Sequence, residues 1–396
     1  MRIYCCTPAS FPADEDSFFS RESGLFCRTF QFLGIESRSV MLLPGYPQDS
    51  ADVLRGRFQD FCNPAWWRSM RLDGLILYSW GAPKYNAVAK AIHEAGIPTV
   101  IYMDTCGLVS RLGNCRAWWQ FAWRPAWASG ANLLLKLISI AKFIVDSLFL
   151  VTARRRISHL DCSHAVTLPT RQGVIWMKRE LSCLGRPDLA NKIFYSPHPQ
   201  KSLFRYDHAP KENIIICVAR FLPEDWPQKR PALLIKSLNE FMERKLQWQA
   251  LVVGRGATQL THSLGIHSHP GIFFEENLAH KDLVLLYQKA KIGFWTSLSE
   301  GQQGAAAQAL CCGCSVVAPS SPLNSCFADY VCQSSGRLAL DSSVCSLADA
   351  LYLESEDWAN GHRLPDKISL HWSALLHSEE RARAVLRLLN ITSPPG

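Results

Sequence analysis

One short segment of the sequence combines an isolated carboxylate with a glycine-flanked helix start. The stretch SLSEGQQGAAAQALCCGCSVVAP, residues 297–319, places Glu300 just before a run of alanines that ends at Gly313. The pattern predicts a loop, a helix with a glycine stop and a β-branched strand. The backbone N–H groups at Gly301–Gly304 would favour an anion such as phosphate. Glu300 would repel phosphate but would accept hydrogen bonds from sugar hydroxyls, so the segment suits a sugar nucleotide; an ordinary strand–helix junction with a solvated glutamate is the alternative.

Strands and helices alternate along the chain and would position this segment. In the first half, strands are expected at residues 2–8, 36–44, 73–80, 98–104, 164–169 and 192–199. Helices are expected at residues 23–34 and 84–96. In the second half, strands are expected at residues 213–221, 246–254, 291–298 and 314–319. A helix is expected after each of them, at residues 230–245, 280–290, 302–313 and 346–354. Such alternation implies parallel sheets with helices on both faces.

We therefore predict an α/β protein of two Rossmann-like domains that face each other across a cleft. The charged, proline-containing segment 205–212 is the expected boundary, which gives domains 1–208 and 209–396. In open parallel sheets, ligands bind beyond the carboxyl ends of the strands. The strand before Glu300 ends at that position.

Composition limits the compartment and the class of protein. The chain has 396 residues, of which 48% are hydrophobic, so large cores can form. No secretory leader is visible and the 15 cysteines show no paired framework, which favours a reducing cytoplasm. Cys311 and Cys314 form a single Cys-x-x-Cys, which we interpret as packing of small residues and not as a metal or redox site.

Residues 111–156 form a basic, tryptophan-rich segment. It contains eight Lys or Arg residues and one acidic residue, Asp146, for a net charge of +7, and four tryptophans. This composition suits an anionic membrane surface or an acidic ligand, and a solvated basic face over an aromatic core is the alternative. No nucleic-acid-binding motif accompanies the segment, so nucleic acid is not an expected partner.

The apolar stretch 131–151 is long enough to cross a bilayer but carries polar residues at helical spacing. Lys142 and Asp146 would each cost about 2.5–3.5 kcal/mol within hydrocarbon. We expect a helix that packs in a domain or lies on a membrane, and not a span.

The segment 297–319 resembles the donor-site segment of family 4 glycosyltransferases, the retaining GT-B enzymes with a group 1 domain. The matching positions are Ser297, Glu300, Gly301, Cys312, Gly313, Val316, Val317 and Ala318. Further segments match in the family's order, namely IFYSPHPQKSLF, VARFLPEDWPQKRPALLIKSL, LVVGRG, HKDLVLLYQKAKIGFWTSLSEG and Ser335–Leu338. The resemblance covers about residues 190–355 and implies a GT-B fold, with the acceptor on the first domain, the nucleotide-sugar donor on the second, and a last helix that crosses back to the first.

The resemblance also implies roles for individual residues. Arg220 and Lys229 would neutralise the departing diphosphate without a metal or other cofactor. Glu300 would hold hydroxyls of the transferred sugar. The residues expected to bind the nucleotide are Gly254, Gly301, Gln302, Gln303, Gly304 and Gln308.

The sequence departs from the family pattern at several points. Gln308 stands where the family has a glutamate that accepts from the ribose hydroxyls. The loop between Arg220 and Lys229 is longer than usual, which makes Arg230 an alternative cation. On the acceptor side, Gly24 is the nearest substitute for a pair of glycines, Asp104 stands where the family often has His-Asp, and His198 would line the cleft.

These features predict a hexosyltransferase-type enzyme that moves a sugar from a nucleotide sugar to an acceptor hydroxyl with retention of configuration, in polysaccharide or glycoconjugate biosynthesis. The expected acceptor is a sugar or a lipid-linked sugar, and the expected place is the cytoplasm, at the inner face of an anionic membrane. A GT-B relative with weakened catalysis that acts as a binding protein and a sugar-nucleotide epimerase are the alternatives.

Overall fold

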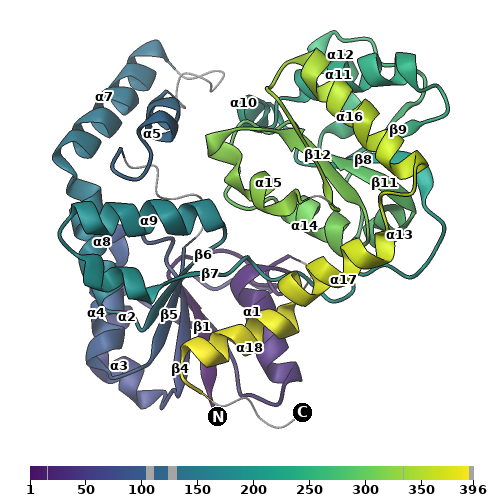
Figure 1. Cartoon of the computed structure of the whole chain (residues 1–396). Helices are drawn as coiled ribbons and strands as arrows, with labels where there is room; N and C mark the ends of the chain where they lie inside the picture. Colours follow the sequence, from purple (N-terminus) through teal and green to yellow (C-terminus); the bar gives the residue numbers. More distant parts are fainter. Residues whose placement is uncertain (16, 104–110, 124–131, 333, 392–396) are drawn as a thin grey trace. The chain divides into compact units, whose positions relative to one another are not determined.

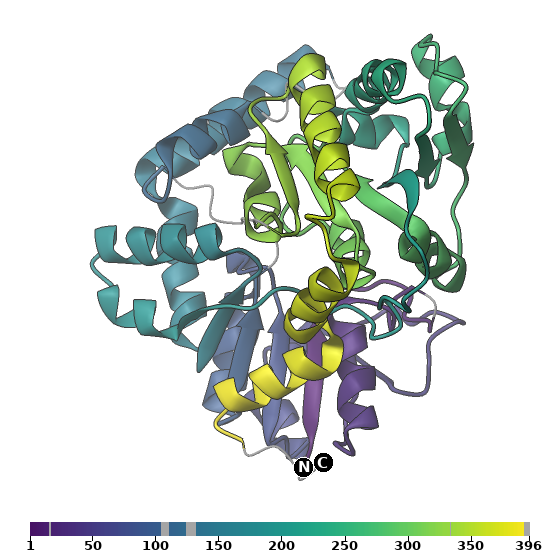
Figure 2. The ribbon, with the colours of Figure 1, turned by 45° about the vertical axis from the view of Figure 1, so that its right-hand side comes forward.

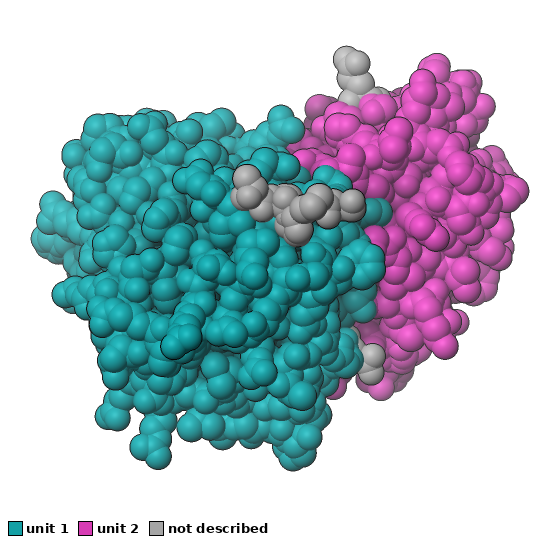
Figure 3. Space-filling view, turned by 90° about the horizontal axis from the view of Figure 1, so that it is seen from below, with its two compact units in different colours: residues 1–119, 141–201, 376–396 teal, residues 120–140, 202–375 magenta. Residues whose placement is uncertain are grey.

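The computed structural model describes residues 1–15, 17–103, 111–123, 132–332 and 334–391 (Figure 1). The chain forms two compact units, which Figure 3 colours separately. Unit 1 comprises residues 1–119, 141–201 and 376–396, and unit 2 comprises residues 120–140 and 202–375. The final segment of the chain therefore belongs with the first.

Unit 1 contains a seven-stranded sheet with the order β3-β2-β1-β4-β5-β6-β7. Each neighbouring pair is parallel. The strands are β1 (Ile3–Thr7), β2 (Ser39–Leu42), β3 (Val53–Gly56), β4 (Gly74–Tyr78), β5 (Thr99–Tyr102), β6 (Ala165–Leu168) and β7 (Ile193–Tyr195). The order reverses between β1 and β4, so their carboxyl ends form the crevice where such sheets bind ligands.

Helices cover both faces of this sheet (Figures 1 and 2). Ile3 and Cys5 of β1 join a core that contains side chains of the first and last helices of the chain, whereas Tyr4 and Cys6 join a second core. This alternation follows from the two-residue period of a strand. The helices of unit 1 are α1 (Glu22–Phe32), α2 (Phe58–Phe61), α3 (Pro64–Ser69), α4 (Asn86–Glu94), α8 (Val151–Asp161), α9 (Arg171–Cys183) and α18 (Ser378–Leu388).

Two further helices, α5 (Cys115–Ala122) and α7 (Leu133–Phe149), contain residues from the ranges of both units. The ring of Trp118 on α5 stacks on that of Phe143 on α7, with centroids 6.3 Å apart. In the described part of the chain, every helix is too short or too polar to traverse a bilayer.

Unit 2 contains a six-stranded parallel sheet with the order β10-β9-β8-β11-β12-β13. The strands are β8 (Glu212–Val218), β9 (Gln249–Val253), β10 (Ile272–Glu275), β11 (Ala290–Phe294), β12 (Ser315–Pro319) and β13 (Gly336–Ala339). The helices are α10 (Trp226–Lys229), α11 (Pro231–Arg244), α12 (Leu260–Leu264), α13 (His280–Lys289), α14 (Gly304–Cys311), α15 (Ser325–Tyr330), α16 (Val344–Ala359) and α17 (Pro365–Leu376). The predicted alternation of strands and helices around parallel sheets is confirmed in both units.

Two local features fix the helices of unit 2. Gly313 adopts φ 78° after α14, and a Cβ there would lie 2.8 Å from the carbonyl oxygen of Pro365, so the glycine ends the helix as its position in the sequence predicts. The half-buried Lys211 donates from Nζ to three carbonyl oxygens, those of Tyr287 (2.8 Å), Ala290 (2.9 Å) and Cys312 (2.8 Å). Burial lowers the pKa of Lys211. This lysine therefore joins the ends of α13 and α14 to the start of β8.

Candidate active site

The candidate site lies at the carboxyl edge of the unit 2 sheet. The strand order reverses between β8 and β11, which are direct neighbours. The loop that begins at Ala219 follows β8, and the loop that contains Glu300 follows β11 and leads into α14. A crevice at this reversal is where an open parallel sheet binds its ligand.

Lys229 and Glu300 form a buried ion pair at this edge. Lys229 Nζ lies 2.5 Å from Glu300 Oε1, and the two side chains are only 9% and 7% exposed. Two amide groups also donate to this carboxylate, Gln228 Nε2 at 3.4 Å and Gln303 Nε2 at 3.3 Å. A charged pair with so little access to water is held by its mutual attraction and by these hydrogen bonds.

The loop that carries Glu300 is fixed to α10 by one backbone and one side-chain hydrogen bond. The amide of Leu298 donates to the carbonyl oxygen of Gln228 (2.7 Å), and Gln228 Nε2 donates to that of Ser299 (2.8 Å). On the other side, the amide of Glu300 donates to the carbonyl oxygen of Leu323 (3.0 Å). Because both flanks are bonded, the carboxylate is positioned before any ligand arrives.

Arg230, the alternative cation, has a structural role. It adopts φ 51° between α10 and α11, and its guanidinium donates from Nε to the carbonyl oxygen of Thr296 (2.6 Å) and from Nη2 to that of Ser297 (3.2 Å). Burial lowers the pKa of Arg230 to about 10. Since these donors are already engaged with the loop, Lys229 is the cation that faces Glu300.

Arg220 follows β8 in the same unit but does not contact this pair. Its Nη2 lies 3.2 Å from Asp225 Oδ1, and the arginine side chain is 69% exposed. The extra length between Arg220 and Lys229 forms one 3₁₀ turn, Pro223–Asp225, and helix α10. The structure thus brings Lys229 and Glu300 together, whereas Arg220 is exposed in the loop that follows β8.

The amino end of α14 provides backbone donors beside the pair. The first hydrogen bond of this helix runs from the amide of Ala307 to the carbonyl oxygen of Gln303, so the amides of residues 304–306 lie before the helical ladder. The Gln303 side chain makes no capping hydrogen bond to them. A Cβ on Gly304 would meet nothing within 4 Å, so its backbone borders open space. This end of α14 can accept an anion.

The other predicted nucleotide-binding residues surround this helix end. Gly301 and Gln302 are half-buried in the loop, and Gln308 is half-buried one turn into α14. The alanines of α14 are the reason that the helix sits close to the sheet, because Ala306 and Ala307 have no exposed surface.

Gly254 shapes the backbone that follows β9. It has φ 140°, and a Cβ there would lie 1.8 Å from the carbonyl oxygen of Ala219, so no other residue fits. The amide of Phe221 donates to the carbonyl oxygen of Arg255 (2.8 Å). Gly254 therefore allows the loops after β8 and β9 to run side by side.

The predicted acceptor-side residues belong to unit 1. Gly24 is the third residue of α1, and a Cβ there would lie 2.3 Å from the carbonyl oxygen of Phe18. A side chain at position 24 would therefore collide with the chain itself, and the acceptor-side role of Gly24 stays a prediction. His198 is 7% exposed and lies beside the stacked rings of Tyr78 and Tyr102, at centroid distances of 6.1 and 6.2 Å. Asp104 lies outside the described residues.

A second buried histidine contacts the residue that directly follows β4. His159 Nε2 on α8 is 2.6 Å from Ser79 Oγ, and both residues have no exposed surface. Burial, and secondarily the charge of Arg156, lowers the pKa of His159 to about 4. The imidazole is therefore neutral at pH 7 and packs as part of the core.

Sequence reasoning missed three residues that hold the site. Gln228 bonds to the carboxylate and its loop, Thr296 Oγ1 donates to the carbonyl oxygen of Lys229 (3.0 Å), and Asn324 Nδ2 donates to that of Ser297. Their partners lie 27 to 72 residues away in the chain. No local pattern could have indicated them.

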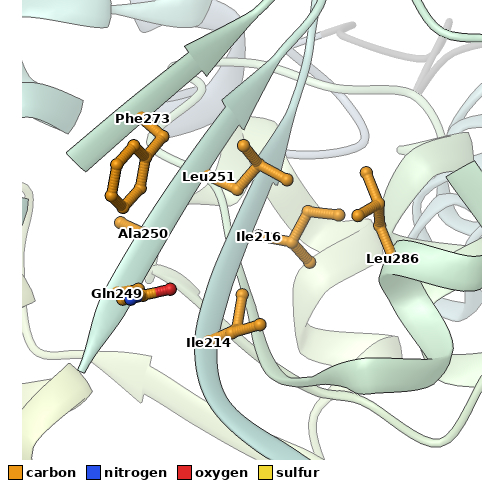
Figure 4. A pocket seen from close by; sticks show the side chains of 7 residues that line it. All are labelled: Ile214, Ile216, Gln249, Ala250, Leu251, Phe273 and Leu286. Atoms are coloured by element: carbon orange, nitrogen blue, oxygen red, sulfur yellow. The ribbon is translucent and has the colours of Figure 1, made fainter. Parts of the chain in front are cut away.

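An apolar pocket of about 90 Å³ lies on the face of the sheet and not at its carboxyl edge (Figure 4). It is lined by residues of β8, β9, β10 and α13, namely Ile214, Ile216, Gln249, Ala250, Leu251, Phe273 and Leu286. Its lining contains no charged group, so it does not suit a phosphorylated ligand.

Comparison with known proteins identifies a family for part of the chain. Residues 212–352 match the family model described as glycosyl transferases group 1. No curated protein matches the sequence. The structure of HepE from Anabaena, determined with UDP and glucose, is similar to the whole chain, with a TM-score of 0.61, 14% identity, and coverage of 98% of this chain and 99% of that one.

Two other structures are similar to the same extent. Sucrose-phosphate synthase from Thermosynechococcus elongatus has a TM-score of 0.58 and 14% identity, and covers 98% of both chains. A glycosyltransferase from Rickettsia africae has a TM-score of 0.62 and 12% identity, and covers 98% of this chain and 97% of that one. Matches of this identity establish the GT-B fold, and the family model covers the part of the chain that contains Lys229 and Glu300. Residues 212–352 thus form a group 1 glycosyltransferase domain within a chain of the GT-B fold, and the protein is a glycosyltransferase.

Proposed function

We propose that unit 2 binds a nucleotide sugar and that the enzyme transfers the sugar to an acceptor hydroxyl with retention of anomeric configuration. The observation that carries the proposal is the buried pair of Lys229 and Glu300, 2.5 Å apart, at the strand-order reversal. A cation and a carboxylate side by side match a donor in which a diphosphate adjoins a hexose. HepE, whose structure contains UDP and glucose, has the same fold.

In this proposal the two residues of the ion pair bind different parts of the nucleotide sugar. The Lys229 ammonium binds the diphosphate and stabilises the charge that develops as it leaves. The amides at the start of α14 donate to a phosphate oxygen. Glu300 accepts from hydroxyls of the hexose. With a cation and a helix terminus at the leaving group, the proposed reaction uses no metal ion.

Arg220 would contribute a second positive charge. Its side chain is 69% exposed, and its Nη2 lies 3.2 Å from the carboxylate of Asp225, which is 12% exposed. Moving this side chain to a bound diphosphate would exchange that carboxylate for an anion of higher charge. The planar guanidinium presents a rigid pair of donors that matches two phosphate oxygens, a fixed geometry that an ammonium lacks.

Gln308 would accept a hydrogen bond from the ribose as a neutral group. A neutral acceptor gives a weaker bond than a carboxylate, so donor binding would be weaker than with glutamate. The acceptor, a sugar or lipid-linked sugar of a polysaccharide or glycoconjugate, would bind to unit 1 near the carboxyl ends of β4 and β5, where His198 lies.

A panel of nucleotide sugars screened by thermal shift tests the donor. A ligand that binds only the folded protein at about 100 times its Kd adds about 2.7 kcal/mol, which raises the Tm. We expect one nucleotide sugar to raise the Tm of the wild type but not that of Lys229→Met. Lys289→Met, which changes a lysine that is 56% exposed, is the control and should respond as the wild type does.

Transfer itself is tested with the donor found in this screen. The anomeric configuration of the product, read by NMR, should equal that of the donor, and Glu300→Gln should lose transfer. Inverted product would refute retention, and full transfer by Glu300→Gln would refute the role of the carboxylate. Gln308→Glu should lower the Kd of the nucleotide, and an unchanged Kd would remove Gln308 from the donor site.

A further inference from the structure

Helix α7 presents an uncovered apolar face. Eight of its large apolar side chains are between 50% and 71% exposed, namely Leu133, Leu134, Leu135, Leu137, Ile138, Val145, Leu148 and Phe149. Isolated exposed apolar residues are ordinary, but a contiguous set on one helix marks an interaction surface.

The spacing of these residues shows that they form one face. Leu134, Ile138, Val145 and Phe149 recur at four, seven and four residues, which places them on one side of the helix. The opposite side contains Ile140, which is 6% exposed, and the half-buried Lys136, Phe143 and Ser147. The helix therefore packs through a mixed face and leaves its apolar face outward, the reverse of an ordinary surface helix.

Exposed cations lie on α7 and on two helices near it in the chain, α5 and α8. Lys142 is exposed on α7 itself, and Arg116, Arg154 and Arg155 are exposed on α5 and α8. Asp146, the one acidic residue of the segment, accepts from the amide (3.2 Å) and the hydroxyl (2.9 Å) of Thr152 at the start of α8. The single negative charge is thus used as a helix cap, and the cations remain at the surface.

The aromatic residues suit the boundary between water and hydrocarbon. Trp119 on α5 is 51% exposed and Trp123 is 39% exposed. Indole rings favour the headgroup level of a bilayer because one edge is polar and the rest is apolar. The stacking of Trp118 on Phe143 joins α5 to α7, and the two helices lie side by side in Figure 1.

We propose that α7 binds in the plane of an anionic membrane surface, with its apolar face among the acyl chains and the exposed cations at the lipid phosphates. Seventeen residues make a helix of about 26 Å, which is shorter than the roughly 30 Å of bilayer hydrocarbon. A helix in the interface needs an immersion of only about 5–10 Å, from which Lys142 can extend its ammonium to the headgroups.

The charges favour this occupant over a second copy of the chain. A dimer through this face would bring the Lys142 of each copy into an apolar interface without an acidic partner, which is costly. Anionic lipid headgroups supply the countercharge and the acyl chains supply the apolar surface. Membrane binding goes beyond the transfer reaction and does not depend on it, so the two proposals can fail separately.

Vesicle flotation tests the proposal with the full-length protein. The vesicles contain phosphatidylcholine alone or with about 30% phosphatidylglycerol, which gives a negative surface. We expect the wild type to float with the anionic vesicles, less with the neutral ones, and less in about 1 M salt, where the Debye length is about 3 Å. A wild type that stays at the bottom with anionic vesicles, or that floats equally with both kinds, would overturn the proposal.

A pair of double variants assigns the effect to α7. Leu134→Glu with Ile138→Glu should lower vesicle binding at least about tenfold, and because both positions are exposed and glutamate favours helices, the fold should persist. The control, Leu246→Glu with Leu340→Glu, places the same charges at positions that are 73% and 94% exposed in unit 2 and should bind like the wild type.

Two further readouts separate the alternatives. Transfer to a water-soluble acceptor should be equal in the wild type and the α7 variant, because that reaction needs no membrane. Equal flotation of the α7 variant and the wild type would overturn the proposal, as would a wild-type dimer in sedimentation that the α7 variant abolishes, since the face would then bind a second copy.

Discussion

Removal of one partner from the Lys229–Glu300 pair should destabilise unit 2 far more than removal of both. Glu300→Gln leaves a buried ammonium without a countercharge, and Lys229→Met leaves a buried carboxylate. The double variant leaves neither charge. The comparison separates the attraction between the two groups from the cost of burying each.

The magnitude follows from the distance and the burial. At 2.5 Å and an effective dielectric constant of about 20, the attraction is about 7 kcal/mol. Desolvation of two ions costs several kcal/mol for each, which offsets most of that gain. Each single change should therefore lower the free energy of unfolding by about 3–5 kcal/mol. The coupling energy between the two changes should reach about 3 kcal/mol.

Thermal melts of the four proteins measure this coupling. With about 2–4 °C for each kcal/mol in a unit of this size, the single variants should melt about 6–20 °C below the wild type, and the double variant above both. The exposed pair of Lys289 and Glu212, 3.8 Å apart, is the control and should couple by less than about 1 kcal/mol. Additive losses at Lys229 and Glu300 would refute the claim that the two charges stabilise each other.

Three further predictions concern residues outside this pair. Gly254→Ala should destabilise the protein by more than about 3 kcal/mol in a urea melt, because the new Cβ would meet a backbone oxygen. The control Gly265→Ala, which places its Cβ in open space at φ 61°, should cost about 1 kcal/mol. Equal costs for the two variants would contradict this account. The native state keeps His159 neutral down to pH about 4, whereas the unfolded chain protonates it at about 6.5, so the free energy of unfolding should fall by up to about 3 kcal/mol as the pH drops through that range. His159→Gln should remove this part of the slope, and an unchanged slope would assign it to other groups. Lys211→Met should cost about 2–3 kcal/mol, because it removes the Nζ donor from three carbonyl oxygens, two of which would keep only the weak donor Cys314 Sγ; the exposed Lys289→Met should cost less than about 0.5 kcal/mol.

Local patterns explain why much of the fold could be predicted from the sequence. The strand before Glu300, the helix after it and the stop at Gly313 depend on residues within a few positions of one another. Hydrophobic periodicity and glycine placement report such local geometry directly. The two parallel sheets then follow from the alternation of these elements.

Contacts between distant residues could not be predicted in this way. Gln228 reaches Glu300 across 72 positions, and Gly24 is required by the carbonyl group of Phe18 that packs against it. The sequence of α7 showed an amphipathic helix but not which face the rest of the chain would cover. That choice depends on tertiary packing, which no window of the sequence contains.

The division of unit 1 into separate chain segments determines when it can finish folding. Its sheet and α1 bury apolar side chains of α18, among them Val385 and Leu386. A ribosome makes α18 only after all of unit 2, so unit 2 can fold during synthesis while one core of unit 1 still lacks its covering helix. Synthesis of the segment that contains α18, and not that of the first strands, is therefore the step that completes unit 1.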